Sequence, residues 1–215
     1  MSSRLAEAER IRHALEEDRL LLYGQPILDL GTLDGWVVRK AIALIAEQVR
    51  AGRRLRLHVN LSGKSIGDAT LVALAEQALT DAGIDPTLPV FELTETAAIA
   101  NIEEAKRFAT RLRGRGCGFA LDDFGAGFGS FYYIKNFPFD YLKIDGAFIR
   151  GLGTSRMDQL VVRAIVDIAK GLGKKTVAEF VGDAEAIRLL REIGVDCAQG
   201  YHIGRPRPVA GLLDA

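Results

Sequence analysis

The sequence predicts an α/β barrel, a closed ring of parallel strands with helices around it. Short apolar segments alternate with longer amphipathic segments along the 215-residue chain, a pattern typical of parallel strands joined by helices. Polar side chains stand at or near the carboxyl ends of six of these apolar segments: Asn60, Glu92, Asp122, Asp123, Asp145, Glu179 and Gln199. A barrel gathers such strand ends around one mouth, whereas an open doubly wound sheet would spread them along an edge. We therefore favour the barrel.

The composition is that of a globular protein. The 28 Lys and Arg residues balance the 28 Asp and Glu residues, which argues against a dedicated nucleic-acid binder. Hydrophobic residues make up 48 % of the chain, which excludes general disorder. No apolar run approaches the roughly 20 residues of a membrane span, and the amino terminus lacks the apolar core of a secretory signal. Cys117 and Cys197 stand far apart, so we expect two reduced thiols in a cytoplasmic protein.

The expected elements follow one another in a regular order. Residues 4–18 predict a helix, interpreted within residues 1–19 as a linker from an upstream domain, and residues 20–215 form a single domain. Strands are expected at 22–30, 55–61, 88–94, 117–122, 140–145, 175–180 and 196–200. Helices are expected at 36–51, 65–83, 97–114, 155–172 and 183–193, and Gly173 and Gly194 fit the ends of the last two. Only seven strands result, where a closed barrel needs eight, and the shortfall falls at residues 30–36.

Three segments carry the predicted chemistry: Phe91–Thr96, Leu121–Gly127 and Ala178–Val181. Adjacent aspartates at a strand end repel one another unless a cation lies between them, and hard oxygen ligands suit Mg²⁺ or Mn²⁺. Asn60 offers a neutral oxygen. Two neighbouring ions would form a clamp for the attack of water on a phosphodiester, with Lys143 placed to orient a water or to neutralise a phosphate oxygen.

Each of these residues also has an ordinary structural interpretation. A lone Asp-Asp pair is usually a turn or a helix cap, Glu92 alone fits a solvated strand end, and Lys143 alone fits a surface lysine. His58 shares a face with Asn60 and is expected to pack in the interior. The aromatic residues Phe128, Phe131, Tyr132 and Tyr133 are expected to pack in a loop or core rather than to stack on bases. The joint placement of the acidic residues at strand ends favours a functional site.

These residues resemble the EAL family of cyclic di-GMP phosphodiesterases. The matching strings occur in family order over roughly residues 20–210: Gln25-Pro26-Ile27, Val59-Asn60-Leu61-Ser62, Glu92-Leu93-Thr94-Glu95, Asp122-Asp123-Phe124-Gly125, Leu142-Lys143-Ile144-Asp145, Ala178-Glu179, Gln199-Gly200-Tyr201 and Gly204-Arg205-Pro206. Each string is weak alone, and the combination is specific.

The resemblance implies a modified (β/α)8 barrel with one antiparallel strand that hydrolyses cyclic di-GMP to linear pGpG with two Mg²⁺ or Mn²⁺ ions. One ion would be held by Asn60, Glu92 and Asp122, and the second by Asp122, Asp123 and Glu179. Lys143 would contact the attacking water, and Gln199 would lie close to the substrate. Glu95 would anchor a loop over residues 122–130 that also serves dimerisation. The resemblance further implies a homodimer and, in the parent protein, upstream GGDEF or sensory domains.

Two departures from the family pattern matter. The motif that names the family, Glu-x-Leu-x-Arg on the second strand, is absent between Leu30 and Trp36, where the strand count also falls short. Its glutamate is a metal ligand, and its arginine contacts a substrate phosphate. In addition, Gly182 stands where many members carry an acidic residue.

Three explanations of the missing motif stay open: a segment of the natural protein that the printed sequence omits, an engineered deletion, or a naturally degenerate family member. The intact remaining motifs favour the first two, and the chain as printed should be catalytically impaired. The alternative function is accordingly a non-catalytic EAL module that binds cyclic di-GMP or a protein partner. A different Mg²⁺-dependent barrel enzyme, such as an enolase-like one, is a third possibility.

Overall fold

The computed structural model describes residues 33–125 and 135–209, and residues 28–205 fall in one compact unit. Its centre is a sheet of six strands, all parallel, in the order β1-β2-β3-β4-β5-β6. The strands are Leu57–Asn60, Pro89–Thr94, Gly118–Phe124, Tyr141–Ile144, Lys175–Ala178 and Cys197–Ala198. The described residues 206–209 fall outside this unit.

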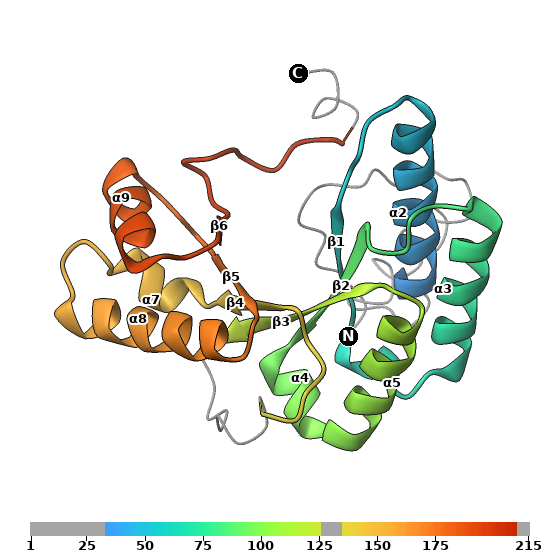
Figure 1. Cartoon of the computed structure of the whole chain (residues 1–215), viewed down its shortest axis with the longest axis horizontal. Coiled ribbons are helices and arrows are strands. Elements are labelled where there is room, and N and C mark those ends of the chain that lie inside the picture. The colour runs from blue at the N-terminus through green and yellow to red at the C-terminus, as the bar shows by residue number, and fades with distance from the viewer. Residues whose placement is uncertain (1–32, 126–134, 210–215) are drawn as a thin grey trace, which may run out of the picture. The chain divides into compact units, whose positions relative to one another are not determined.

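The strand order decides between the two predicted architectures. Each strand pairs with the next strand along the chain, whereas a doubly wound sheet reverses its order at a switch point. Right-handed crossovers between sequential parallel strands place all the helices on one side of the sheet. The sheet is therefore a curled half-barrel of the predicted class (Figure 1). The strand expected at 22–30, the helix expected at 4–18 and the domain boundary at residue 20 lie outside the described residues.

The helices connect successive strands and pack on the outside of the sheet (Figure 1). Helix α2 packs on β1, α5 on β3, and α8 on β4 and β5. The helices are α2 Leu33–Arg50, the short 3-10 helix η1 Gly63–Ser65, α3 Ala69–Ala82, α4 Glu95–Ala100, α5 Ile102–Gly114, α7 Gly146–Arg150, α8 Arg156–Gly171 and α9 Ala184–Ile193.

Local sequence signals set several helix ends. The side chain of Asp183 accepts a hydrogen bond from the backbone N–H of Ala186 at the start of α9, and Gly194 ends that helix with a φ of 89°. An acceptor side chain at the start and a left-handed glycine at the end satisfy groups that the helix itself leaves unpaired. At Gly173, with a φ of 66°, the chain likewise leaves α8.

Three expectations about the helices need correction. Helix α2 begins at Leu33 rather than at residue 36, and Asp34 lies in its first turn. There the buried Asp34 carboxylate accepts hydrogen bonds from the Ser62 N–H at 2.8 Å and the Ser65 hydroxyl at 2.5 Å. The helix expected at 97–114 is two helices that meet at Asn101. Helix α7 directly follows β4 and was not expected.

Apolar side chains fill the concave face of the sheet below the candidate site. Val90, Ala120, Tyr141 and Val177, one from each of the four central strands, form a buried cluster. Alternate residues of a strand point to the same face. The residues two positions further along each strand therefore stand directly above this apolar layer, toward the carboxyl ends of the strands.

Candidate metal centre

A layer of charged side chains lies above the apolar cluster of Val90, Ala120, Tyr141 and Val177. Each charged residue follows one of these apolar residues by two positions in the sequence, and all four are buried: Glu92, Asp122, Lys143 and Glu179. They come from β2, β3, β4 and the residue that follows β5. The strands thus bring together, at one end of the sheet, side chains that are far apart in the sequence.

Lys143 is the centre of this layer. Its Nζ atom lies 2.8 Å from Oε2 of Glu92, 2.8 Å from Oδ1 of Asp122 and 2.9 Å from Oε1 of Glu179. Burial lowers the pKa of the Lys143 ammonium, but the three carboxylate charges outweigh burial and raise its pKa overall. Lys143 is therefore a fixed positive charge inside a ring of carboxylates, not the surface lysine of the ordinary interpretation.

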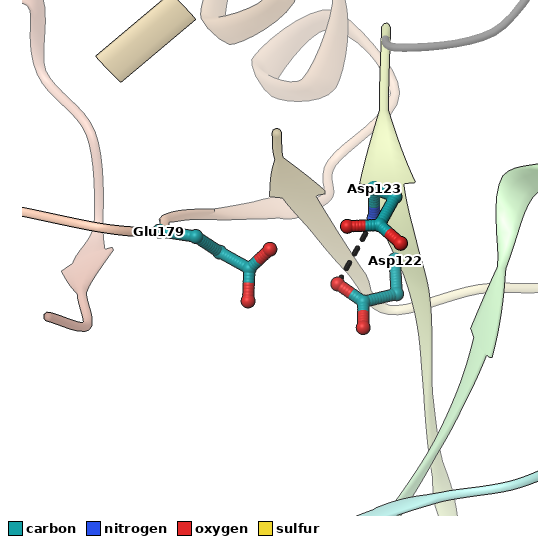
Figure 2. Close-up of side chains that lie close together, drawn as sticks. All are labelled: Asp122, Asp123 and Glu179. Atoms are coloured by element: carbon teal, nitrogen blue, oxygen red, sulfur yellow. Dashed lines mark hydrogen bonds between the residues drawn. The ribbon is translucent and has the colours of Figure 1, made fainter. Parts of the chain in front are cut away.

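Three carboxylates of the site are close enough to share a cation. Asp122, Asp123 and Glu179 each offer an oxygen within 4.8 Å of the others. Figure 2 shows Glu179 facing the two aspartates, with the backbone N–H of Asp123 donating to Oδ1 of Asp122 at 2.9 Å. Asp123 adopts a φ of 53°, a left-handed conformation that is uncommon outside glycine. That turn of the backbone brings two consecutive carboxylates to the same site.

Burial and the charges of neighbouring carboxylates raise the pKa values of Asp123 and Glu179. Burial raises the pKa of Asp123, and the neighbouring Asp122 charge raises it further. Burial also raises the pKa of Glu179 to about 7, because the attraction of Lys143 does not offset the loss of water. A divalent cation between the carboxylates would offset both the loss of water and the repulsion between negative charges. The donor set consists of carboxylate oxygens, which fits Mg²⁺ or Mn²⁺ rather than a soft metal.

Both carboxylate oxygens of Glu92 have a hydrogen-bonding partner. Besides the Lys143 contact, its Oε1 atom lies 2.5 Å from Nδ1 of His58. Since a carboxylate only accepts hydrogen bonds, the tautomer of His58 that fits carries a proton on Nδ1. Burial raises the pKa of Glu92, but the hydrogen bond from His58 and the charge of Lys143 prevail and lower its pKa overall.

His58 is a site residue that sequence analysis missed. The prediction that His58 packs in the interior is wrong, because the residue is exposed. Its ring packs edge-on against Tyr141 at 5.3 Å, and its Nδ1 atom contacts Glu92. Asn60, on the same strand, is exposed and stands in register with Glu92. The alternation of His58 with Asn60 was the signal for a shared face, but a single strand does not reveal the partner that lies across it.

Two further predicted residues lie beside the site. The buried Glu95 accepts a hydrogen bond from the N–H of Gly125 at 3.0 Å, at the start of the loop that Glu95 is expected to anchor. Gln199 is half-buried and bound through its backbone, because its carbonyl accepts the N–H of Val181 at 3.0 Å. The loop residues 126–130 and the aromatic residues Phe128, Phe131, Tyr132 and Tyr133 lie outside the described residues.

A half-barrel of sequential parallel strands with an acidic centre at their carboxyl ends defines a protein of the (β/α)-barrel class with a candidate metal centre. Comparison with family models makes the assignment specific, because the EAL domain model matches residues 30–206. The chain belongs to the EAL domain family. Within the described residues, no helix combines the length and apolar character needed to cross a membrane.

Curated relatives cover almost the whole chain. It is 35 % identical to the Cyclic di-GMP phosphodiesterase PdeB of Shewanella oneidensis, over 96 % of this chain and 29 % of the relative. It is 33 % identical to the Cyclic di-GMP phosphodiesterase NbdA of Pseudomonas aeruginosa, over 95 % of this chain and 31 % of the relative. The chain thus spans less than a third of the length of these relatives.

Solved structures agree with the fold. The PaMucR phosphodiesterase in complex with c-di-GMP matches with a TM-score of 0.79 and 31 % identity, over 84 % of this chain and 74 % of that one. The Xanthomonas citri FimX EAL domain in complex with c-di-GMP matches with a TM-score of 0.88 and 25 % identity, over 96 % of both chains.

The alignments also measure the missing segment. The alignment with PdeB runs over 245 positions, although 96 % of this 215-residue chain is about 206 residues. The difference is about 39 alignment positions at which PdeB has a residue and this chain has a gap. The alignment with PdeF of Escherichia coli runs over 183 positions and 85 % of the chain, which leaves almost no room for such a gap. The gap therefore lies near one end of the chain, in agreement with the absent motif between Leu30 and Trp36.

Proposed function

We propose that this domain hydrolyses cyclic di-GMP to linear pGpG with two Mg²⁺ or Mn²⁺ ions. The observation that carries the proposal is the group of carboxylates of Asp122, Asp123 and Glu179 within 4.8 Å of one another. Relatives named as cyclic di-GMP phosphodiesterases support the substrate. Complexes of similar EAL structures with c-di-GMP support it as well.

Five residues of the site would hold the two ions. Asn60, Glu92 and Asp122 would hold one ion, and Asp122, Asp123 and Glu179 would hold the second. When bound, such a pair of ions polarises the phosphodiester and makes an attacking water more acidic. Because metal ligands must be deprotonated, and burial raises the pKa of Glu179 to about 7, binding of the ions near neutral pH would release the proton that Glu179 retains in part.

Lys143 would act on the reacting groups directly. Its ammonium stays charged at any physiological pH, because three carboxylates surround it. A buried fixed charge at this position can orient a water molecule or neutralise a phosphate oxygen without reorganisation during the reaction. Gln199, held by its backbone beside Val181, would contact the substrate or its water network.

A second copy of this domain is the proposed protein partner. Helix α8 exposes the large apolar side chains of Met157, Leu160 and Ile168, and Leu172 continues this stripe past its end. A contiguous exposed apolar stripe is typical of an interaction surface. Light scattering after size exclusion tests it: Leu160→Glu should convert a dimer to a monomer, and a monomeric parent chain would contradict it. Upstream sensory or GGDEF domains are proposed for the parent protein, as the greater length of the relatives suggests.

The test of the proposed function uses a chain in which the missing segment is restored from PdeB. The product pGpG should appear with Mn²⁺ or Mg²⁺ and disappear with EDTA. Ca²⁺ should inhibit, because it accepts longer bonds and looser geometry. Asp122→Asn should abolish turnover, while Asp81→Asn, an exposed residue on α3, should leave it unchanged. Full activity in EDTA would contradict the metal centre. Binding of cyclic di-GMP without turnover would instead support the alternative function, a binding module.

A further inference from the structure

Phe180 has an unusual backbone conformation. Within the described ranges, two non-glycine residues have a positive φ, Asp123 and Phe180, both at 53°. Each directly follows a carboxylate of the metal centre, Asp122 or Glu179. This conformation costs a non-glycine residue about 1–3 kcal/mol, and for a bulky side chain it is an outlier. The strain at Asp123 is explained by its own carboxylate, whereas Phe180 brings no metal ligand.

The aromatic ring of Phe180 is fixed but not buried. A side chain at Gly146 would place its Cβ atom 2.2 Å from Cδ2 of Phe180, so the ring rests against the backbone of the first residue of α7. The guanidinium carbon of Arg150, the last residue of α7, lies 4.3 Å from the ring centroid. Phe180 nevertheless keeps 53 % of its surface exposed. It is a flat apolar surface held by the protein and open to solvent, one residue from Glu179.

We infer that the Phe180 ring, backed by Arg150, is the stacking surface for a guanine base of the substrate. The inference rests on the proposed function and adds a base-binding residue to it. Aromatic side chains stack on bases, and each such contact contributes about 1–3 kcal/mol. The guanidinium of Arg150 lies over the ring, 4.3 Å from its centroid, and holds the ring in place for such a contact.

Exposure alone would not single out Phe180. Val49 and Ile203 are also large, apolar and exposed, and isolated residues of this kind need no function. Phe180 differs because three features combine next to the metal centre: a strained backbone, a glycine against which the ring rests, and an arginine over the ring. Glycine at position 180 removes both the strain and the ring. It should therefore stabilise the fold and at the same time weaken binding of the base.

The experiment measures cyclic di-GMP binding to the 215-residue chain by calorimetry in Ca²⁺, with chromatography confirming that the ligand stays intact. Phe180→Gly should raise the melting temperature and yet weaken binding by about 5- to 150-fold, the range that base stacking contributes. Phe180→Trp in a Trp36→Phe background should retain binding. Because Trp36 is the only tryptophan, fluorescence then reports position 180 alone, and it should be quenched by cyclic di-GMP. Val49→Ala, at an exposed position on α2, is the control and should bind like the parent chain.

The outcomes separate the two proposals. Unchanged affinity in Phe180→Gly would overturn the stacking role and leave the proposed function standing. The same holds if the Phe180→Trp variant binds the ligand and its fluorescence is not quenched. Failure of cyclic di-GMP to bind both the 215-residue chain and the chain with the missing segment restored would overturn both. Weaker binding together with a higher melting temperature is the result that supports the inference, because a merely structural residue would lose both.

Discussion

Nδ1 of His58 lies 2.5 Å from Oε1 of Glu92, and the two residues belong to neighbouring parallel strands, β1 and β2. The other oxygen of Glu92 contacts Lys143. The orientation of the Glu92 carboxylate is therefore set from both sides before any ligand arrives. Loss of a partner that orients a metal-ligating side chain typically costs about 10- to 100-fold in metal affinity.

His58→Ala should weaken Mn²⁺ binding by about 10- to 100-fold, because Glu92 loses the partner that orients it. Calorimetric titration of Mn²⁺ into the chain measures this change. His202→Ala is the matched control, since His202 is exposed in the turn after β6. Equal affinities of His58→Ala and the parent chain would show that Lys143 alone is sufficient to place Glu92.

Lys143→Met should destabilise the metal-free chain by about 3–5 kcal/mol, because buried carboxylates lose their counter-charge. Unfolding in urea with EDTA measures the loss, and added Mn²⁺ should recover much of it by supplying a cation to the same carboxylates. Lys106→Met breaks only the exposed pair of Lys106 and Glu103 and should cost less than about 1 kcal/mol. A loss for Lys143→Met that Mn²⁺ does not reduce would count against a shared site.

Gly200→Ala should displace the segment that carries Gln199. An added Cβ atom would lie 2.2 Å from both the N and the O atom of Val181, so the backbone must move, and overpacking of this kind costs about 1–3 kcal/mol. Thermal unfolding measures the cost. Gly204→Ala, which meets nothing within 4 Å, is the control, and equal melting temperatures of the two variants would contradict the predicted clash.

The two cysteines should react with a thiol reagent in clearly different ways. Cys117 is buried, and burial raises the pKa of its thiol to about 11, so little reactive thiolate forms at pH 8. Cys197 is exposed on β6. A colorimetric thiol titration at pH 8 should count one thiol in the native chain and two in urea. Two rapidly reacting thiols in the native chain would contradict the burial of Cys117.

The sheet and the acidic cluster could be predicted because both follow from periodicity. Five of the six described strands lie within their predicted ranges, and β3 extends two residues past its range. The carboxyl ends of parallel strands meet at one edge of the sheet whatever the details of packing. Glu92, Asp122, Lys143 and Glu179 could therefore be grouped before their distances were known.

The contacts that orient the cluster could not be predicted in the same way. His58 on β1 contacts Glu92 on the neighbouring strand β2. Asp34 on α2 accepts hydrogen bonds from Ser62 and Ser65, which are about 30 positions away in the sequence. Such partners depend on register and on where a helix begins, which local propensity does not fix. The positive φ of Phe180 is likewise imposed by its surroundings, since no local signal favours it at a phenylalanine.

The missing segment provides the most direct test of the central claim that the carboxylates of Asp122, Asp123 and Glu179 form part of a phosphodiesterase centre. The measurement is the rate of pGpG formation at saturating Mn²⁺ by the 215-residue chain and by the same chain with the segment restored between Leu30 and Trp36. We expect the restored chain to be active and the printed chain to be slower by at least about 10²–10³, since the family resemblance implies that the segment would supply a metal ligand and an arginine for a substrate phosphate. Comparable rates in the two chains, or no pGpG from either, would contradict the assignment of the metal centre.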